Sequence, residues 1–351
     1  MAAPGSSTLG FLVCGAGAFG RNHLRVIRAL EAEGAPVRLA AIIETDRSRA
    51  DAAAAEWSVP VFASVAEFLA ARFRGEVAAD AASVCVPTSS HFAVAEALLS
   101  ADVDVLIEKP IAATVAEATR LIDMAAEHHR ILQTGHLERF NPAVTATEPL
   151  LNHPMFFEAH RLSVFSPRSL DVDVVLDLMV HDLDIVLSMV RSPVRSLHAV
   201  GLPILSPKVD IANVRVEFES GCVANFTASR VSTERVRKLR FFQPHQYVSI
   251  DYARQDLLVI DVSGSGQQPA ASGQQNLGAA SGLPVLNVAK PAVLPGEPLR
   301  LEIESFLDCV RARSTPRVSG GDGRAALTLA LEINKAIAEH AERAGLGKIG
   351  N

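Results

Sequence analysis

The sequence predicts an α/β protein with two domains: an N-terminal doubly wound parallel sheet, and a C-terminal α+β domain with an open, mostly antiparallel sheet. Three observations support this fold class. The chain has 351 residues, which suits two cores better than one. Apolar runs alternate with helical patterns over residues 1–140. Strand patterns then follow one another almost directly within residues 141–351.

The strands of the first domain are continuous apolar runs, which are typical of a parallel sheet covered on both faces. A helical pattern separates most neighbouring strands, as in doubly wound folds. The predicted strands are residues 9–15, 37–44, 59–63, 81–88, 104–110 and 131–136, and the predicted helices are residues 21–33, 48–57, 65–73, 91–102 and 114–129.

In the second domain one strong helix, residues 174–190, interrupts a series of strands. The strands are residues 155–163, 194–202, 213–220, 222–230, 236–244 and 246–253. Residues 263–281 contain few large apolar groups and are predicted to form a flexible loop. Two helices, residues 299–313 and 323–344, finish the chain and are candidates for packing back on the first domain.

Composition excludes several classes of protein. Hydrophobic residues make up 49% and charged residues 21%, and the net charge is -6. Without a basic run, neither nucleic acid nor an anionic membrane is expected as a main partner. No stretch reaches the roughly 20 apolar residues that cross a bilayer. The four scattered cysteines suit a reducing compartment, so we predict a cytoplasmic protein without disulfides or a metal site.

A glycine-rich segment, "GAGAFG", lies where the first predicted strand meets the first helix. In a dinucleotide site the first glycine makes the tight turn, the second admits the pyrophosphate, and the third allows close helix–strand packing. The helix N-terminus offers N–H groups to the phosphates. We therefore predict that the cofactor contacts this segment through Gly15, Gly17, Ala18, Phe19 and Gly20.

The second strand ends in an acidic residue, Glu44. A carboxylate there accepts hydrogen bonds from the adenosine ribose and repels a 2′-phosphate, which favours NAD over NADP. Arg47 and Arg49 could accommodate that phosphate, but we interpret them as solvated charges on a helix face. Asp46 is predicted to cap the next helix.

The segment "DVLIEKP" places a lysine directly after a buried strand. Ligands of such sheets lie beyond the carboxyl ends of the strands, so Lys109 is predicted at the nicotinamide end of the site. Glu108 precedes it, and the "PTSSH" segment follows the neighbouring strand, so further cofactor contacts are expected at Pro87, Thr88, His91 and Glu108. The alternative is a lysine that reaches solvent or pairs with Glu108.

Together these motifs resemble the Gfo/Idh/MocA family of nicotinamide-dependent sugar oxidoreductases. The resemblance rests on "GAGAFGRNH", "PTSSH", "EKPIA", "GHLERFNP" and "DLMVHDLD", which occur in the family's order and cover nearly the whole chain. It implies that Lys109 is catalytic and that Glu108 and Pro110 fix its position. A cis peptide bond before Pro110 is also conceivable, since only X–Pro bonds make cis inexpensive.

The helix at residues 174–190 carries three polar residues on one stripe. At about 100° per residue Asp177, His181 and Asp184 share a face, whereas Leu176, Leu183 and Leu187 point elsewhere and can pack. Metal binding and a buried ion pair are both open readings of the stripe. The family resemblance implies instead that His181 is the acid/base residue and that Asp177 contacts substrate hydroxyls or Lys109. An imidazole titrates near neutral pH, which suits proton transfer.

Several further residues are substrate candidates. After the last strand of the first domain, His136, Arg139 and Asn141 are expected to line the floor of the cleft, with Arg139 either in a surface ion pair or in contact with an anion. Arg161 and Arg168 precede the catalytic helix and either bind a diphosphate or are ordinary rim charges.

Within the family the chain looks most like the nucleotide-sugar branch. Asp173, Val174, Val175 and Met179 stand where other members of the family often have glycines, and the segment "GHLERFNPA" also favours this branch. That branch implies oxidation of the 3-hydroxyl of UDP-N-acetylglucosamine by NAD, for use in lipid A-type biosynthesis. The alternatives are a dehydrogenase of a free sugar or inositol, and a non-catalytic NAD-binding sensor or scaffold. Family analogy also implies a homodimer or homotetramer.

Overall fold

The computed structural model describes residues 8–165, 172–263, 275–277 and 285–346. The chain divides into two compact units. The first consists of residues 1–137 and 299–327, and the second of residues 138–298 and 328–351. Helix α9 (Gly320–Arg343) therefore contributes its first turns to one unit and the rest to the other.

The first unit is a six-stranded parallel sheet in the order β3-β2-β1-β4-β5-β6. This is the doubly wound arrangement, and β1 lies at the point where the strand order reverses. The strands are β1 (Leu9–Cys14), β2 (Val37–Ile43), β3 (Val61–Phe62), β4 (Ala81–Val84), β5 (Asp104–Glu108) and β6 (Leu132–Gly135), and the helices are α1 (Gly20–Ala32), α2 (Arg47–Trp57), α3 (Val65–Phe73), α4 (Thr88–Ser100), α5 (Val115–Glu127) and α8 (Pro298–Ala312).

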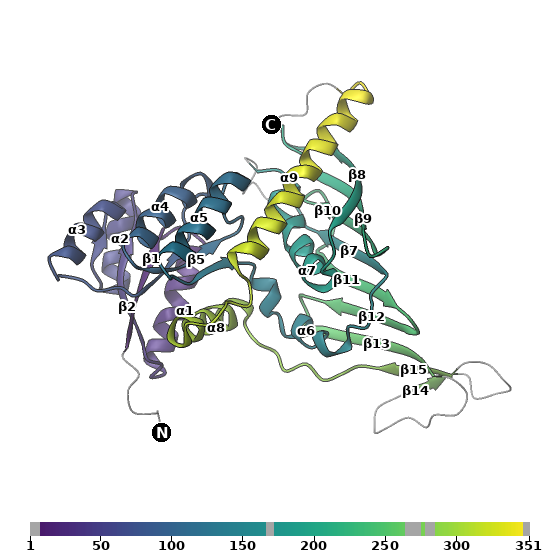
Figure 1. Ribbon diagram of the computed structural model, residues 1–351, viewed down its shortest axis with the longest axis horizontal. Coiled ribbons are helices and arrows are strands. Elements are labelled where there is room, and N and C mark those ends of the chain that lie inside the picture. Colours follow the sequence, from purple (N-terminus) through teal and green to yellow (C-terminus); the bar gives the residue numbers. More distant parts are fainter. Residues whose placement is uncertain (1–7, 166–171, 264–274, 278–284, 347–351) are drawn as a thin grey trace. The chain divides into compact units, whose positions relative to one another are not determined.

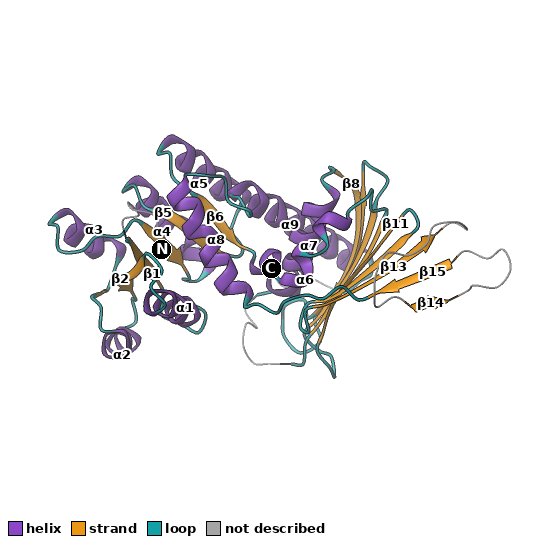
Figure 2. Ribbon diagram, turned by 90° about the horizontal axis from the view of Figure 1, so that it is seen from below, coloured by secondary structure: helices purple, strands orange, loops and turns teal. Residues whose placement is uncertain are grey.

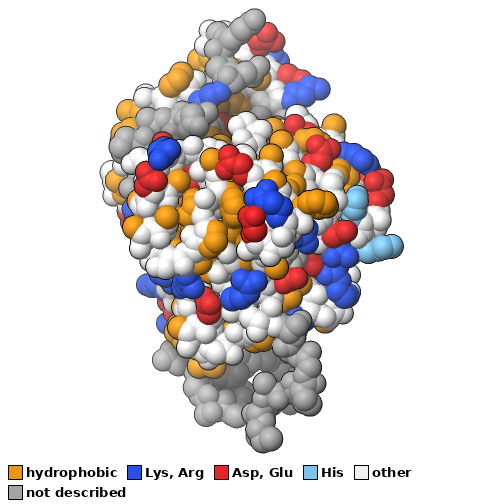
Figure 3. All heavy atoms as spheres, turned by 90° about the vertical axis from the view of Figure 1, so that its left-hand side faces the viewer, with side chains coloured by type: hydrophobic (Ala, Val, Ile, Leu, Met, Phe, Trp, Pro, Cys, Tyr) orange, Lys and Arg blue, Asp and Glu red, His pale blue; other side chains and the backbone are white. Residues whose placement is uncertain are grey.

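Helices cover both faces of this sheet (Figure 2). Residues of α1 and α8 share one apolar cluster with strands β1 and β2, in which Phe11 meets Phe306 edge-on at 6.3 Å between ring centroids. Helices α4 and α5 lie on the opposite face (Figure 2). The outer face of the unit shown in Figure 3 mixes acidic, basic and apolar side chains.

Helix starts in the first unit follow the sequence closely. Asp46 caps α2, as predicted, by accepting a hydrogen bond from the Arg49 amide at 2.9 Å. Thr114 and Glu117 form a reciprocal capping box at the start of α5. These caps satisfy amide groups that the first helical turn cannot use.

The second unit is built on a nine-stranded sheet in the order β14-β15-β13-β12-β11-β7-β10-β9-β8. All neighbouring pairs are antiparallel except β7 with β10. The strands are β7 (Phe156–Leu162), β8 (Val194–Leu202), β9 (Ile211–Phe218), β10 (Val223–Ser229), β11 (Val236–Gln243), β12 (Gln246–Asp251), β13 (Asp256–Ser263), β14 (Gln275–Leu277) and β15 (Val285–Ala289), and the helical segments are η1 (Leu137–Phe140), α6 (Pro142–Thr145), η2 (Glu148–Leu150), η3 (Val175–Met179) and α7 (Val180–Val190).

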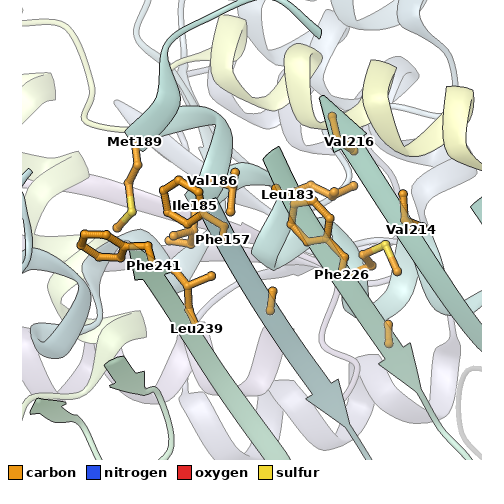
Figure 4. Packing of buried hydrophobic residues seen from close by; sticks show 14 of the residues in the cluster. Phe157, Leu183, Ile185, Val186, Met189, Val214, Val216, Phe226, Leu239 and Phe241 are labelled. Carbon is orange, nitrogen blue, oxygen red and sulfur yellow. The ribbon is translucent and has the colours of Figure 1, made fainter. Parts of the chain in front are cut away.

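One face of this sheet carries the core of the unit (Figure 4). Phe157, Phe226 and Phe241 project from the strands against Leu183 and Val186 of α7. Among the described residues, helices lie on this face only (Figure 2). The sheet thus has one packed face and one open face, as an antiparallel sheet commonly does.

Several details differ from the sequence prediction or fall outside it. Strands β13 and β15 and the short helices η1, α6 and η2 were not predicted. The strand predicted at residues 59–63 is reduced to β3, Val61–Phe62. The helix predicted at residues 174–190 is present, but its first part is the π-helical segment η3. Of the loop predicted at residues 263–281, residues 275–277 form β14, and residues 264–274 and 278–281 lie outside the described residues. No helix in the described ranges combines the length and apolar character that a membrane span requires.

Candidate active site

The glycine segment forms a tight connection between β1 and α1 (Figure 1). Gly15 adopts φ +93°, a left-handed conformation that favours glycine. A Cβ atom on Gly20 would lie 1.8 Å from the carbonyl oxygen of Gly15, so this position also requires glycine. The two outer glycines thus hold the turn itself.

The middle glycine is different, because a Cβ atom on Gly17 would meet nothing within 4 Å. The open space lies next to the N-terminus of α1, which no described side chain caps. A pyrophosphate fits such a place, since it accepts hydrogen bonds from amides at a helix N-terminus. The residues present therefore fit a dinucleotide, and Ala18 and Phe19 belong to the same loop.

Glu44 lies just after the end of β2 and is only 4% exposed. Its carboxylate accepts hydrogen bonds from the amides of Ala16 (2.8 Å) and Asp46 (2.9 Å) and from the guanidinium of Arg49 (2.9 Å). Burial acts to raise the pKa of Glu44, but these three donors outweigh it and the pKa lies below its usual range. Glu44 therefore stays ionised and ties the glycine loop to the start of α2.

The two arginines after Glu44 behave differently. Arg47 is 93% exposed and only loosely paired with Asp51, which agrees with a solvated charge. Arg49 is half-exposed but bound to Glu44, so the interpretation of Arg49 as a purely solvated charge is wrong. Glu44, the carboxylate predicted to bind the ribose, is therefore paired with the guanidinium of Arg49.

Lys109 follows β5 at the carboxyl edge of the sheet and is half-buried. The Lys109–Pro110 peptide bond is cis. On one side of the lysine, the Glu108 carboxylate lies 2.9 Å from Nε2 of His23, whose Nδ1 lies 2.9 Å from Oγ of Ser83. A buried chain of three polar groups from α1, β4 and β5 thus holds Glu108.

A second buried histidine, His91, contacts the backbone on the other side of Lys109. His91 is 1% exposed, and its two ring nitrogens lie 2.8 Å from the carbonyl oxygen of Pro110 and 2.9 Å from that of Val86. Burial lowers the pKa of His91, although the two carbonyls oppose that shift. The side chain braces the backbone around Lys109. Its expected contact with the cofactor stays a prediction, as do the contacts of Pro87 and Thr88.

Within the described residues, one group has metal-ligand character: atoms of His23, Cys85 and Glu108 lie within 4.8 Å of one another. Burial, followed by the negative charge of Glu108, raises the pKa of Cys85 well above its usual value. A metal binds the thiolate, which this environment disfavours. The hydrogen bonds of His23 explain the group better than a metal does.

In the second unit, the predicted stripe of Asp177, His181 and Asp184 is not uniform. Asp177 lies in η3, where the helix is wider than an α-helix, so the spacing assumed for the stripe does not hold there. Asp177 and His181 are half-buried, whereas Asp184 is 2% exposed and pairs with Arg139 at 3.3 Å. Leu183 is in the core and Leu176 and Leu187 pack against it, as predicted.

Arg161 is buried, so it is not a charge at the rim of the site, and its guanidinium is not open to a ligand. It is 4% exposed and lies in the core-facing row of β7. Its guanidinium donates two hydrogen bonds to Asp182, at 2.7 and 3.0 Å, and a third to Glu138 at 3.2 Å. Its guanidinium also lies 5.2 Å from the ring centroid of Tyr252. This arrangement argues against the diphosphate role that the sequence suggested for Arg161.

The remaining substrate candidates also have structural partners. Asn141 caps α6 and donates to Glu138 (3.1 Å) and to the carbonyl oxygen of Tyr252 (3.0 Å). Arg139 forms an ion pair with Asp184, but the pair is largely buried, whereas the first of its two predicted roles required a pair at the surface. His136 is 1% exposed at the end of the first unit, and Arg168 lies outside the described residues. The cleft floor expected from these residues stays a prediction.

The sequence prediction missed residues that hold these motifs in place. Glu138 lies in the quoted "GHLERFNP" segment, Asp182 follows His181, and His23 ends "GAGAFGRNH". The only signal was that each is a charged or polar residue within a motif already selected. Within the second unit, Arg161 connects the "GHLERFNP" segment to the "DLMVHDLD" helix, because it forms ion pairs with Glu138 of the first and Asp182 of the second.

A doubly wound sheet with a glycine-rich turn and a carboxylate after its second strand defines a dinucleotide-binding protein. Residues 9–136 match the model of the oxidoreductase family with an NAD-binding Rossmann fold, and residues 154–243 match the GFO/IDH/MocA C-terminal domain. The chain belongs to the Gfo/Idh/MocA family and is an oxidoreductase acting on CH–OH groups.

Individual relatives agree with this assignment. The UDP-N-acetylglucosamine 3-dehydrogenase of Acidithiobacillus ferrooxidans is 36% identical over 332 residues, which are 94% of this chain and 98% of the relative. Its crystal structure superposes with a TM-score of 0.81 at 34% identity and covers 94% of this chain and 97% of its own. Inositol 2-dehydrogenase 1 of Saccharopolyspora erythraea is 30% identical, over 52% of this chain and 54% of its own length.

Proposed function

We propose that this enzyme oxidises the 3-hydroxyl of UDP-N-acetylglucosamine to the 3-keto sugar, with NAD as the cofactor. The observation that carries the proposal is the similarity to the Acidithiobacillus enzyme, which extends over 94% of this chain and includes both units. The similarity to the Saccharopolyspora inositol 2-dehydrogenase extends over only 52%. A 3-keto nucleotide sugar is a substrate for an aminotransferase, as in lipid A-type biosynthesis.

Three residues are assigned to the chemistry. His181 accepts the proton of the hydroxyl, Lys109 provides positive charge at the developing alkoxide, and Asp177 orients the neighbouring hydroxyls or the ammonium. NAD supplies the hydride acceptor when bound. The proposal requires that Lys109 of the first unit and His181 of the second converge on one carbinol carbon. The support for it is the family membership, together with the hydrogen bonds of Glu108 and His91 that hold the chain around Lys109 within the first unit.

The test is NADH formation by the purified enzyme with UDP-N-acetylglucosamine, N-acetylglucosamine or myo-inositol, each with NAD and with NADP. We expect activity with the UDP-sugar only. UDP-N-acetylglucosamine carrying deuterium at C3 should transfer the label to the cofactor, and the same sugar labelled at C4 should not. Oxidation of myo-inositol alone would support the alternative function, a cyclitol dehydrogenase, which the inositol relatives suggest.

Glu44 is assigned to NAD preference. Glu44→Gln should weaken NAD binding and raise the ratio of NADP to NAD affinity by about tenfold, because the ribose loses an ionised acceptor and Arg49 becomes available to a 2′-phosphate. Titration of both cofactors measures the ratio. The gain in NADP affinity should disappear in Glu44→Gln/Arg49→Met. Glu56→Gln on the exposed side of α2 is the control. An unchanged ratio in Glu44→Gln would refute this role.

Two further properties belong to the proposal. The open face of the second sheet carries Phe156, Phe242 and Tyr247 in contact, at 5.6 and 5.1 Å between ring centroids. Apolar groups on an uncovered sheet support a homodimer or homotetramer. The four cysteines are all free thiols, which supports a reducing compartment such as the cytoplasm.

A further inference from the structure

Strand β11 carries an arginine, Arg237, at the end of its core-facing row. Side chains alternate between the two faces of a strand, and Leu239 and Phe241 are fully buried in the core. Arg237 lies on the same face by this alternation, whereas Lys238 and Arg240 point to the open face. Unlike the two apolar residues of its row, Arg237 is solvent-exposed.

The position of Arg237 is fixed by the strand register. It lies directly opposite Arg161 in the antiparallel pair of β11 and β7. The Cβ atoms of directly opposed residues are about 4.5–5.5 Å apart. Arg161 donates two hydrogen bonds to Asp182, and Asp182 follows His181 in α7. Arg237 is thus linked through two side chains to the residue next to the proposed catalytic histidine, all within the second unit.

The charges around Arg161 permit a second guanidinium here. Arg161 forms ion pairs with two carboxylates, Glu138 and Asp182, and both carboxylates also act favourably on the positive charge of Arg237. A guanidinium remains charged in proteins. In the described part of the chain, the side chain of Arg237 forms no hydrogen bond or ion pair, so its guanidinium donors are open to solvent.

We propose that Arg237 binds the diphosphate of the nucleotide sugar. This inference rests on the proposed function. A guanidinium offers paired N–H donors that match phosphate oxygens. Arg237 lies opposite Arg161, which binds the residue that follows His181. Arg237 takes the role that the sequence suggested for Arg161, which is buried and directs three hydrogen bonds to Asp182 and Glu138.

Calorimetric titration of the full-length enzyme with UDP tests the assignment. UDP should bind to Arg237→Met about tenfold to hundredfold more weakly than to the wild type, as expected for loss of a charged hydrogen-bonding partner. Arg237→Lys, which keeps the charge but loses the fork, should show an intermediate loss. NAD affinity, which depends on the first unit, should not change in either variant.

Arg240→Met is the matched control, since Arg240 lies on the same strand but on the open face, where it pairs with Glu158 at 2.9 Å. Equal UDP affinity in the wild type and in Arg237→Lys and Arg237→Met would overturn the inference and leave the proposed function standing. If Arg237→Met does not fold, Arg237→Lys decides alone. A wild-type enzyme that does not bind UDP would instead refute the nucleotide-sugar function itself.

Discussion

Lys109→Ala and His181→Ala should each lower kcat by about 10²–10⁴-fold and leave NAD bound with its wild-type affinity. The lysine is expected to stabilise the alkoxide and the histidine to accept its proton, and groups in these roles typically contribute rate factors of this size. The measurements are initial rates of NADH formation with UDP-N-acetylglucosamine and a separate titration with NAD. Loss of turnover without loss of cofactor binding separates a catalytic role from a structural one.

Two exposed residues serve as controls for these variants. Lys335→Ala on α9 and His198→Ala on β8 should retain wild-type rates, because both side chains face solvent. The acid limb of the pH profile of kcat/KM should also be lost with His181, since that limb reports protonation of the general base. Full activity in both Lys109→Ala and His181→Ala would remove the proposed mechanism.

Arg161→Met should destabilise the second unit by about 3–5 kcal/mol, the cost of leaving one partner of a buried ion pair without its countercharge. Here the carboxylates of Asp182 and Glu138, 3% and 7% exposed, would both lose their guanidinium partner. Because Asp182 adjoins His181, turnover should fall as well. The expected loss is large for a single substitution.

The two units can be followed separately in urea, because both tyrosines lie in the second unit and the single tryptophan, Trp57, lies in the first. Arg161→Met should shift the tyrosine transition to lower urea, with a much smaller shift of the Trp57 signal. Arg240→Met breaks a half-exposed ion pair on the same sheet and should cost less than about 1 kcal/mol. Equal shifts in the two variants would show that the buried network contributes no more than a surface pair.

Much of the fold followed from local pattern. The apolar runs and the glycine segment predicted the parallel sheet, because a strand buried on both faces must be apolar throughout. Alternation along β7 and β11 predicted strands equally well, but it could not say which row faces the core. In β7, both rows mix apolar and polar residues: Phe156 precedes Glu158 on one, and Phe157 precedes Arg161 on the other. Only the packed sheet shows that Arg161 is buried.

The candidate site divides in a similar way. Lys109, the glycine loop and the Asp46 cap could be placed from the sequence, since their positions relative to a strand end or a helix start are local properties. The partners of Glu44, Glu108 and Arg161 could not, because hydrogen bonds between residues far apart in the chain depend on the fold. The π-helical turn at Asp177 could not be predicted from the sequence either, because the prediction for residues 174–190 used the 3.6-residue period of an α-helix throughout.

The order of strands and helices, the dinucleotide turn and the position of Lys109 after a buried strand were all determined by the sequence itself, because each depends on residues within a few positions of one another. The tertiary structure decided what the sequence left open or could not show: that α8 packs with α1 against the first sheet, that Arg161 is bound by Asp182 and Glu138, and that Arg237 is exposed to solvent. Burial and charge pairing are properties of the neighbours that folding assembles, and an isolated stretch of chain does not contain them.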